Sequence, residues 1–383
     1  RRVLFRSKTV LNLGFTTAVL LAIFGIMQFF GKADFGIQWS QNAQERVFGT
    51  IGHSNHFGAY LGMFFVVGIP LLIESFQKKL YYKMAAIAVS MLILSATISL
   101  TGSRGALFAT IIASVIIGIV LFSKKIINKK SSTLASKIVL AMATGFLIIL
   151  IIAGQAGVFK RIENSFHDLQ QGYLPDRLSW WQSGFSMFKD RPLLGFGVST
   201  FSDFYNQYRR TDYLVPADLQ DQISPESSHN DYVDLLVNQG ILGLLSYVFL
   251  IGLILFPLLK QVRTPKNIDE KLIICTALLG GIFTYLIQVF VNFGVVDTLS
   301  IYFILLGLSV SAARPAINSK NIKTISFDHK TKNINFLIGL TSTLVISIFI
   351  TSGIIFTYRD AAADMAYAQG YRASFTDIAE AQK

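Results

Sequence analysis

Apolar runs of roughly 15 to 22 residues recur along the chain and are separated by polar stretches. Runs close to or above 18 residues are long enough to cross the hydrocarbon core of a bilayer as helices. We expect nine such spans, at roughly 9–30, 57–73, 84–100, 106–122, 138–154, 241–259, 272–292, 298–312 and 336–357. The pattern predicts an all-α, polytopic membrane helix bundle, with one large polar loop, residues 155–240, that contains short helices of its own.

The composition supports a membrane protein. Hydrophobic residues make up 52% of the chain and charged residues 15%, and the mean hydropathy is +0.52. Soluble domains are about 25% charged, so an ordinary soluble protein is excluded.

Basic residues predict the orientation. Lysines and arginines gather in four alternate loops, 74–83, 123–137, 260–271 and 313–335, and such loops face the cytoplasm. The Thr101–Gly105 turn, the large loop and the C-terminal tail then face outward. Because this topology accounts for most of the net charge of +12, we expect contacts with membrane lipids and no nucleic-acid partner.

Two terminal segments are set apart from the membrane domain, which we place at 8–357. Residues 1–7 resemble a translated adapter sequence, so we exclude them from fold reasoning and expect the natural chain to start upstream. Residues 358–383 resemble the start of a tetratricopeptide repeat, which predicts an outward helical segment that binds a protein partner and continues past the last residue. A plain amphipathic helix is the alternative for this tail.

Histidines offer two candidate sites. His53-x-x-His56 has a spacing seen in metal sites, but no third ligand follows at a useful distance, so we expect neither a metal nor a cofactor. Ser228-x-x-Asp231 resembles a capping box and places His229 in the first turn of a helix that begins near Ser228. The helix dipole and nearby arginines then keep the imidazole neutral and able to accept a proton. The alternative is a histidine that caps the helix or packs at the membrane interface.

Two arginines lie beside the predicted outer face. Arg104 follows Gly102 in a tight turn between two spans, and its planar guanidinium suits the oxygens of a phosphate. Arg177 opens an amphipathic helix that begins at Pro175-Asp176 and carries adjacent tryptophans suited to the lipid–water interface. The alternatives are a snorkelling side chain for Arg104 and a surface ion pair for Arg177.

Four segments together resemble a known family. They are Gly49–Leu61, Leu100–Ala106, Arg177–Gly197 and Ser228–Gly243, in this order and on the predicted outer face. Over roughly residues 45–310 the chain resembles the O-antigen ligase / O-antigen polymerase superfamily of bacterial envelope enzymes.

This resemblance implies a GT-C-like membrane glycosyltransferase of the cytoplasmic (inner) membrane, with its active site on the periplasmic face. The donor would be a glycan on polyprenyl (undecaprenyl) pyrophosphate, and the acceptor a lipid A-core, a growing glycan or a protein. The family's catalytic histidine matches His229, and its pyrophosphate-binding arginines match Arg104 and Arg177. We add Arg191 and Asn230, from the same motifs, as substrate-binding residues. Members are thought to need no metal.

Two other classes stay open. A transporter or flippase for lipid-linked glycans would use the arginines as a path, but it predicts charges inside the spans and helices broken near mid-membrane. A non-catalytic assembly protein is the second. The predicted spans hold few ionisable groups, which favours the enzyme; ligase or polymerase is left undecided.

Overall fold

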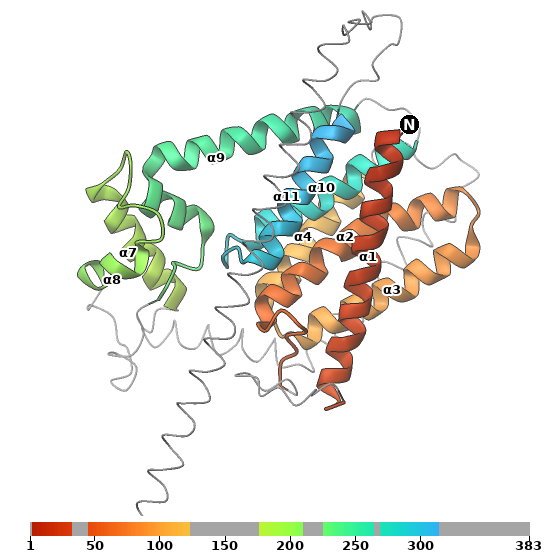
Figure 1. Ribbon diagram of the computed structural model, residues 1–383, viewed down its shortest axis with the longest axis horizontal. Coiled ribbons are helices and arrows are strands. Elements are labelled where there is room, and N and C mark those ends of the chain that lie inside the picture. Colours follow the sequence, from red (N-terminus) through yellow and green to blue (C-terminus); the bar gives the residue numbers. More distant parts are fainter. Residues whose placement is uncertain (1, 33–44, 123–175, 210–224, 264–268, 314–383) are drawn as a thin grey trace, which may run out of the picture. The chain divides into compact units, whose positions relative to one another are not determined.

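In the computed structural model the described residues are 2–32, 45–122, 176–209, 225–263 and 269–313, and all regular elements among them are helices (Figure 1). They are α1 (Arg2–Phe29), α2 (Ser54–Gln77), α3 (Tyr81–Leu100), α4 (Arg104–Phe122), α7 (Asp176–Asp190), α8 (Phe201–Tyr208), α9 (Asp231–Arg263), α10 (Glu270–Gln288) and α11 (Val296–Ala313). These residues belong to one compact unit, Arg1–Pro315. The predicted all-helical membrane class is confirmed.

Seven of these helices are long and apolar enough to span a bilayer: α1 from Arg6, α2, α3, α4, α9, α10 and α11. They correspond to seven of the nine predicted spans. The other two, 138–154 and 336–357, lie outside the described residues, as does the tail 358–383. Helix α1 begins at Arg2, so the residues that we excluded from fold reasoning continue the first span as helix.

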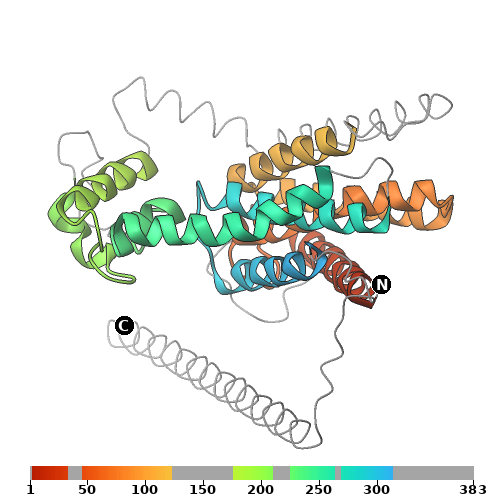
Figure 2. The same cartoon turned by 90° about the horizontal axis from the view of Figure 1, so that it is seen from above.

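The centre of the bundle is formed by α2 and α10. Their most apolar windows are 83% and 72% buried, and α2 contacts α1, α3, α4 and α10 (Figure 2). Small residues permit this close packing. A Cβ on Gly280 would lie 2.6 Å from Val66 Cγ1, and a Cβ on Gly62 would overlap Thr110 Oγ1. Glycine at helix contacts is typical of membrane bundles, where close approach supplies the attraction.

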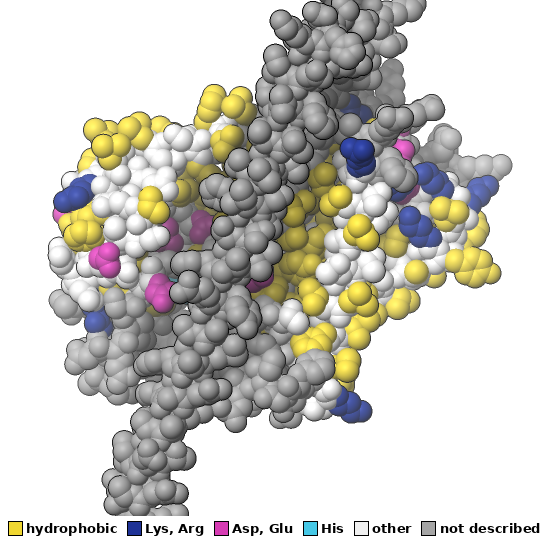
Figure 3. Space-filling model, in the orientation of Figure 1, with side chains coloured by type: hydrophobic (Ala, Val, Ile, Leu, Met, Phe, Trp, Pro, Cys, Tyr) yellow, Lys and Arg dark blue, Asp and Glu magenta, His cyan; other side chains and the backbone are white. Residues whose placement is uncertain are grey.

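Helix α9 joins the bundle to a smaller cluster. Gly240 has φ 65° and ψ −169°, which divides α9 into two helical parts. The C-terminal part contacts α10 and α11 but is otherwise apolar and exposed, for example at Phe249 and Phe256. Apolar side chains are likewise spread over the described surface in Figure 3. Such a surface is stable in lipid and not in water.

The N-terminal part of α9 packs against α7 and α8 around the buried side chains of Met187, Phe201, Tyr205, Val233 and Val237. The loop that follows α7 docks on α9 through its backbone. Phe196 N donates to Val237 O (2.8 Å), and Ile241 N donates to Pro192 O (2.8 Å). Two glycines with positive φ, Gly195 and Gly240, allow the two backbones to come this close.

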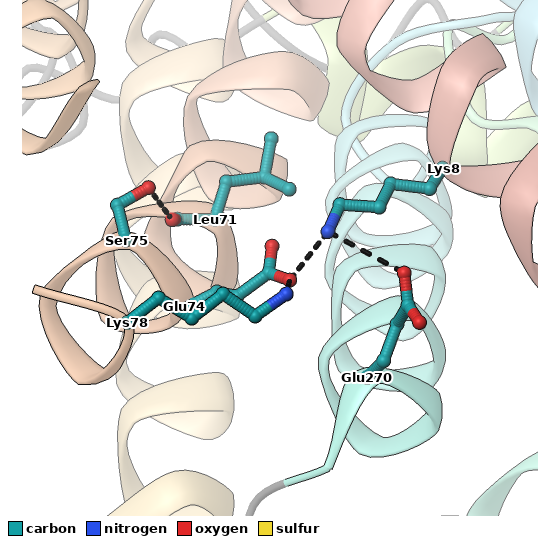
Figure 4. A network of polar contacts seen from close by, with 6 residues as sticks. All are labelled: Lys8, Leu71, Glu74, Ser75, Lys78 and Glu270. Atoms are coloured by element: carbon teal, nitrogen blue, oxygen red, sulfur yellow. Dashed lines mark hydrogen bonds and ion pairs between the residues drawn. The ribbon is translucent and has the colours of Figure 1, made fainter. Parts of the chain in front are cut away.

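An ion-pair network joins three helices at one end of the bundle (Figure 4). The buried carboxylate of Glu74, on α2, accepts hydrogen bonds from Lys8 of α1 and from Lys78 (2.6 Å), and Lys8 also reaches Glu270 of α10 at 3.5 Å. The hydrogen bond from Lys78 to Glu74 raises the pKa of Lys78. This end carries the basic loop 74–83 and the described residues at both ends of loop 260–271, so it is the end predicted to face the cytoplasm.

Candidate functional site

A polar cavity of about 120 Å³ lies at the opposite end of the bundle, where α2 and α4 begin and α10 ends. Its lining consists of three arginines, three side-chain amides and a tight turn: Arg46, Asn55, Gly102, Ser103, Arg104, Gly105, Arg177, Gln288, Val291 and Asn292. No residue of this described lining is acidic. The cavity therefore concentrates positive charge away from the predicted cytoplasmic end.

The Thr101–Gly105 turn places Arg104 at the cavity. Gly102 has φ 60°, which reverses the chain after α3, and the hydroxyl of Ser103 accepts a hydrogen bond from Ala106 N (3.3 Å), which caps α4. Arg104 is the first residue of α4 and its side chain is exposed. The guanidinium thus adjoins the positive end of a helix dipole, where anions bind.

Arg46 is a third arginine of the cavity, and the sequence analysis missed it. Its Nε donates to Thr101 O (2.8 Å), and its Nη2 donates to Asn55 Oδ1 (2.8 Å). Arg46 therefore ties the turn to the start of α2. Its position just before the Gly49–Leu61 motif, on the predicted outer side, was the signal available in the sequence.

Arg177 reaches the same cavity from α7. The helix begins at Asp176, as predicted, so Arg177 lies in its first turn. The two tryptophans of α7, for which we expected an interfacial role, contact the segment before α9. Trp181 Nε1 donates to Ser228 O (3.0 Å), and Trp180 stacks on His229 with ring centroids 4.8 Å apart. A partly buried indole N–H usually finds such an acceptor, so Trp180 and Trp181 also fix the segment before α9.

His229 lies near Arg177 in an aromatic cage, formed by Trp180 and Phe293. It stacks on Trp180 and meets Phe293 edge-on at 4.9 Å. Burial, and next the charge of Arg177, lower its pKa from 6.5 to about 4, while an interaction with the Asn292 side chain raises it in part. The lowered pKa agrees with the expected neutral imidazole; burial is the largest cause, the expected arginine charge follows, and the expected helix dipole is not among the causes. The Nδ1 atom is buried and has no hydrogen-bond partner within the described part of the chain.

The predicted start of the second outer helix was wrong. Helix α9 begins at Asp231, and its cap is Asn230, whose Oδ1 accepts from Tyr232 N (3.0 Å) and Val233 N (3.3 Å). The hydroxyl of Ser228 instead donates to the carbonyl of Asn230 (3.0 Å). His229 therefore precedes the helix, with φ 55°, a left-handed conformation that costs a non-glycine residue about 1 kcal/mol or more.

The other two motif histidines adjoin the same cage. The rings of His53 and His56 are 4.8 Å apart, and His56 contacts the face of the cage at Phe293 (5.0 Å). His53 Nδ1 accepts from Asn55 N (3.2 Å) and caps α2. Burial and the charge of Arg46 lower the pKa of His53. Among the residues that the structure describes, no group of three or more acidic, histidine or cysteine ligands has metal-site geometry.

The other two predicted substrate-binding residues, Arg191 and Asn230, do not line the cavity. The guanidinium of Arg191 lies 4.7 Å from the ring centroid of Phe196, in the loop after α7, and Arg191 is not among the residues that line the cavity. Asn230 is buried, and its side-chain carbonyl caps α9. Arg104 and Arg177 thus share one cavity, and Arg177 is electrostatically coupled to His229. Substrate roles for Arg191 and Asn230 stay predictions.

Comparison with known proteins finds a relative and a family model that match parts of the chain. The chain is 26% identical over 221 residues to an uncharacterized protein of Haemophilus influenzae, an alignment that covers 55% of this chain and 52% of that protein. The chain therefore spans about half the length of this relative. Residues 89–248 match the family model described as O-antigen ligase, and this segment includes Arg104, Arg177 and His229. The resemblance seen in the sequence is confirmed: residues 89–248 of this multi-pass membrane protein match the O-antigen ligase family.

Proposed function

We propose that this protein transfers a glycan from polyprenyl (undecaprenyl) pyrophosphate to an acceptor hydroxyl, at the outward face of the bacterial cytoplasmic membrane. The family match supports glycan transfer of the ligase or polymerase type in general. The observation that carries the finer proposal is one cavity with Arg46, Arg104 and Arg177 and no acidic residue in its described lining, coupled to the neutral imidazole of His229.

The arginines stabilise the leaving group. As the bond between the anomeric carbon and the pyrophosphate oxygen breaks, its electron pair and the negative charge move to the pyrophosphate. Guanidinium groups donate paired hydrogen bonds to phosphate oxygens, and groups already positioned at the cavity stabilise the developing charge without reorganisation. Arg104 and Arg177 line one cavity from different segments, so both can donate to the same diphosphate.

His229 activates the acceptor. The acceptor oxygen forms the new bond to the anomeric carbon, and the imidazole takes the hydroxyl proton and then releases it to water. The pKa of about 4 for His229 applies when no anion offsets the charge of Arg177. An anionic donor beside Arg177 offsets that charge and raises the pKa of His229, so the base becomes stronger once the donor is bound.

The acceptors consistent with an outward site are a lipid A-core, a growing glycan or a protein. A turnover assay distinguishes an enzyme from a transporter, because a transporter does not release undecaprenyl pyrophosphate. Purified protein in lipid nanodiscs is mixed with an undecaprenyl pyrophosphate-linked glycan and an acceptor, and release of undecaprenyl pyrophosphate is measured. We expect release by the wild type, no release by His229→Ala despite donor binding, and at least about a 100-fold loss for Arg104→Lys.

Arg263→Lys is the matched control, because Arg263 ends α9 at the basic end of the bundle. It should keep wild-type turnover. Full turnover by a double Arg104→Lys, Arg177→Lys variant would contradict the proposed roles of the arginines. Inhibition by EDTA that added metal reverses would contradict the metal-independent mechanism.

A further inference from the structure

Two buried side-chain amides in the cavity have no part in the proposed mechanism. Gln288 and Asn292 are only 3% and 2% exposed, and both line the cavity. Across the described chain, Nε2 and Oε1 of Gln288 and Oδ1 of Asn292 find no hydrogen-bond partner. Native proteins pair nearly all buried polar atoms, so several unpaired atoms in one cavity indicate a ligand that pairs with them. Neither residue lies in the segment that matches the family model.

The turn at the start of α4 leaves room for the amide of Gln288. Gln288 is the last residue of α10, and a Cβ on Gly105 would lie 3.3 Å from Gln288 Oε1 and 2.8 Å from Val291 Cγ2. The missing side chain of Gly105 is therefore what gives the amide its room. Arg104, the neighbour of Gly105, brings a guanidinium to the same wall of the cavity.

Asn292 connects the cavity to the proposed base. It lines the cavity together with Arg177, and its side chain interacts with His229. In glycan transfer the anomeric carbon must lie between the pyrophosphate and the activated acceptor. The two amides line the same cavity as the arginines, and Asn292 also interacts with the imidazole, so they suit contact with the sugar ring of the donor.

The unpaired atoms distinguish a sugar from a phosphate. The two ends of an amide are assigned from its surroundings, but both ends of Gln288 lack partners, so a donor and an acceptor are unpaired in either orientation. An ionised phosphate offers only acceptors and would leave the amide oxygen unsatisfied. A hydroxyl or an acetamido group offers both a donor and an acceptor.

We propose that Gln288 and Asn292 form a subsite for the sugar directly attached to the pyrophosphate, and that they select donors whose first sugar carries hydroxyl or acetamido groups at this position. The proposal rests on the proposed function. It assigns recognition of the diphosphate to the arginines and recognition of the first sugar to the amides.

The test compares two ligands of the full chain in nanodiscs: undecaprenyl pyrophosphate, and the same lipid carrying one 2-acetamido-hexose. Gln288→Met replaces the amide with an apolar chain of similar shape. We expect it to weaken binding of the sugar-bearing lipid by about fivefold to tenfold, the effect of one or two hydrogen bonds, and to leave binding of the bare lipid unchanged. Asn292→Leu should act in the same direction.

Thr284→Val is the matched control, because Thr284 lies one turn earlier on α10, is buried, and its hydroxyl donates within its own helix, to Gly280 O (2.8 Å). It should change neither affinity. Equal weakening of both lipids by Gln288→Met would mean that the amide contacts the diphosphate, and no weakening of either would mean that water alone pairs with it; each result overturns the proposal. If the wild type binds neither lipid, the proposed function itself has failed. Thermal unfolding confirms that each variant is folded.

Discussion

The docking of the loop after α7 on α9 gives the sharpest structural prediction. Gly240→Ala would place a side chain where the backbone has φ 65° and ψ −169°, a region occupied almost only by glycine, at about 1–3 kcal/mol. The new Cβ would also overlap the carbonyl group of Leu193 and lie 2.6 Å from Leu194 N. The two backbones must separate, which breaks hydrogen bonds of about 1 kcal/mol each, such as Ile241 N to Pro192 O (2.8 Å).

The sum is about 4 kcal/mol, or roughly a 1000-fold rise in local opening. Hydrogen exchange of the amides of Phe196 and Ile241, followed by mass spectrometry in nanodiscs, measures this opening directly. We expect these amides to lose their protection, with the spans unaffected. Gly252→Ala is the control, since Gly252 lies on α9 and a Cβ there would meet no heavy atom within 4 Å. Unchanged protection in Gly240→Ala, or equal loss in both variants, would refute the reasoning.

Three further predictions concern the site and the opposite end of the bundle. Arg177→Gln removes a positive charge that lowers the pKa of His229, so NMR titration should show a higher pKa than in the wild type, and a lower or equal value would contradict the coupling. Trp181→Phe removes the hydrogen bond to the carbonyl just before His229, and turnover should fall several-fold with donor affinity retained. Glu74→Gln breaks the buried ion-pair network and should lower the unfolding temperature clearly, whereas Glu270→Gln, at the more exposed carboxylate, should change it little; similar shifts would argue against the network.

The local sequence was sufficient to predict the membrane spans and the order of the motifs. A run of about 18 apolar residues has one stable solution in a bilayer, because a helix satisfies its own backbone. The seven described spans therefore follow from the sequence, and so does the helix that begins at Asp176. Helix starts were harder to predict. Ser228 and Asp231 had the right residue types for a cap, but Asn230 provides it, since several polar residues in a row compete for the same N–H groups.

The composition of the site was decided by tertiary structure. Arg46 lies far along the chain from Gln288 and Asn292, and none of the three lies within the four motif segments that carried the family resemblance. They meet Arg104 because α2, α4 and α10 pack closely through glycines, which brings their outward ends together. The low pKa of His229 likewise depends on burial and on a guanidinium 52 positions away in sequence. Hydrophobic length is a property of neighbouring residues, whereas burial and charge coupling are properties of atoms that only packing brings together.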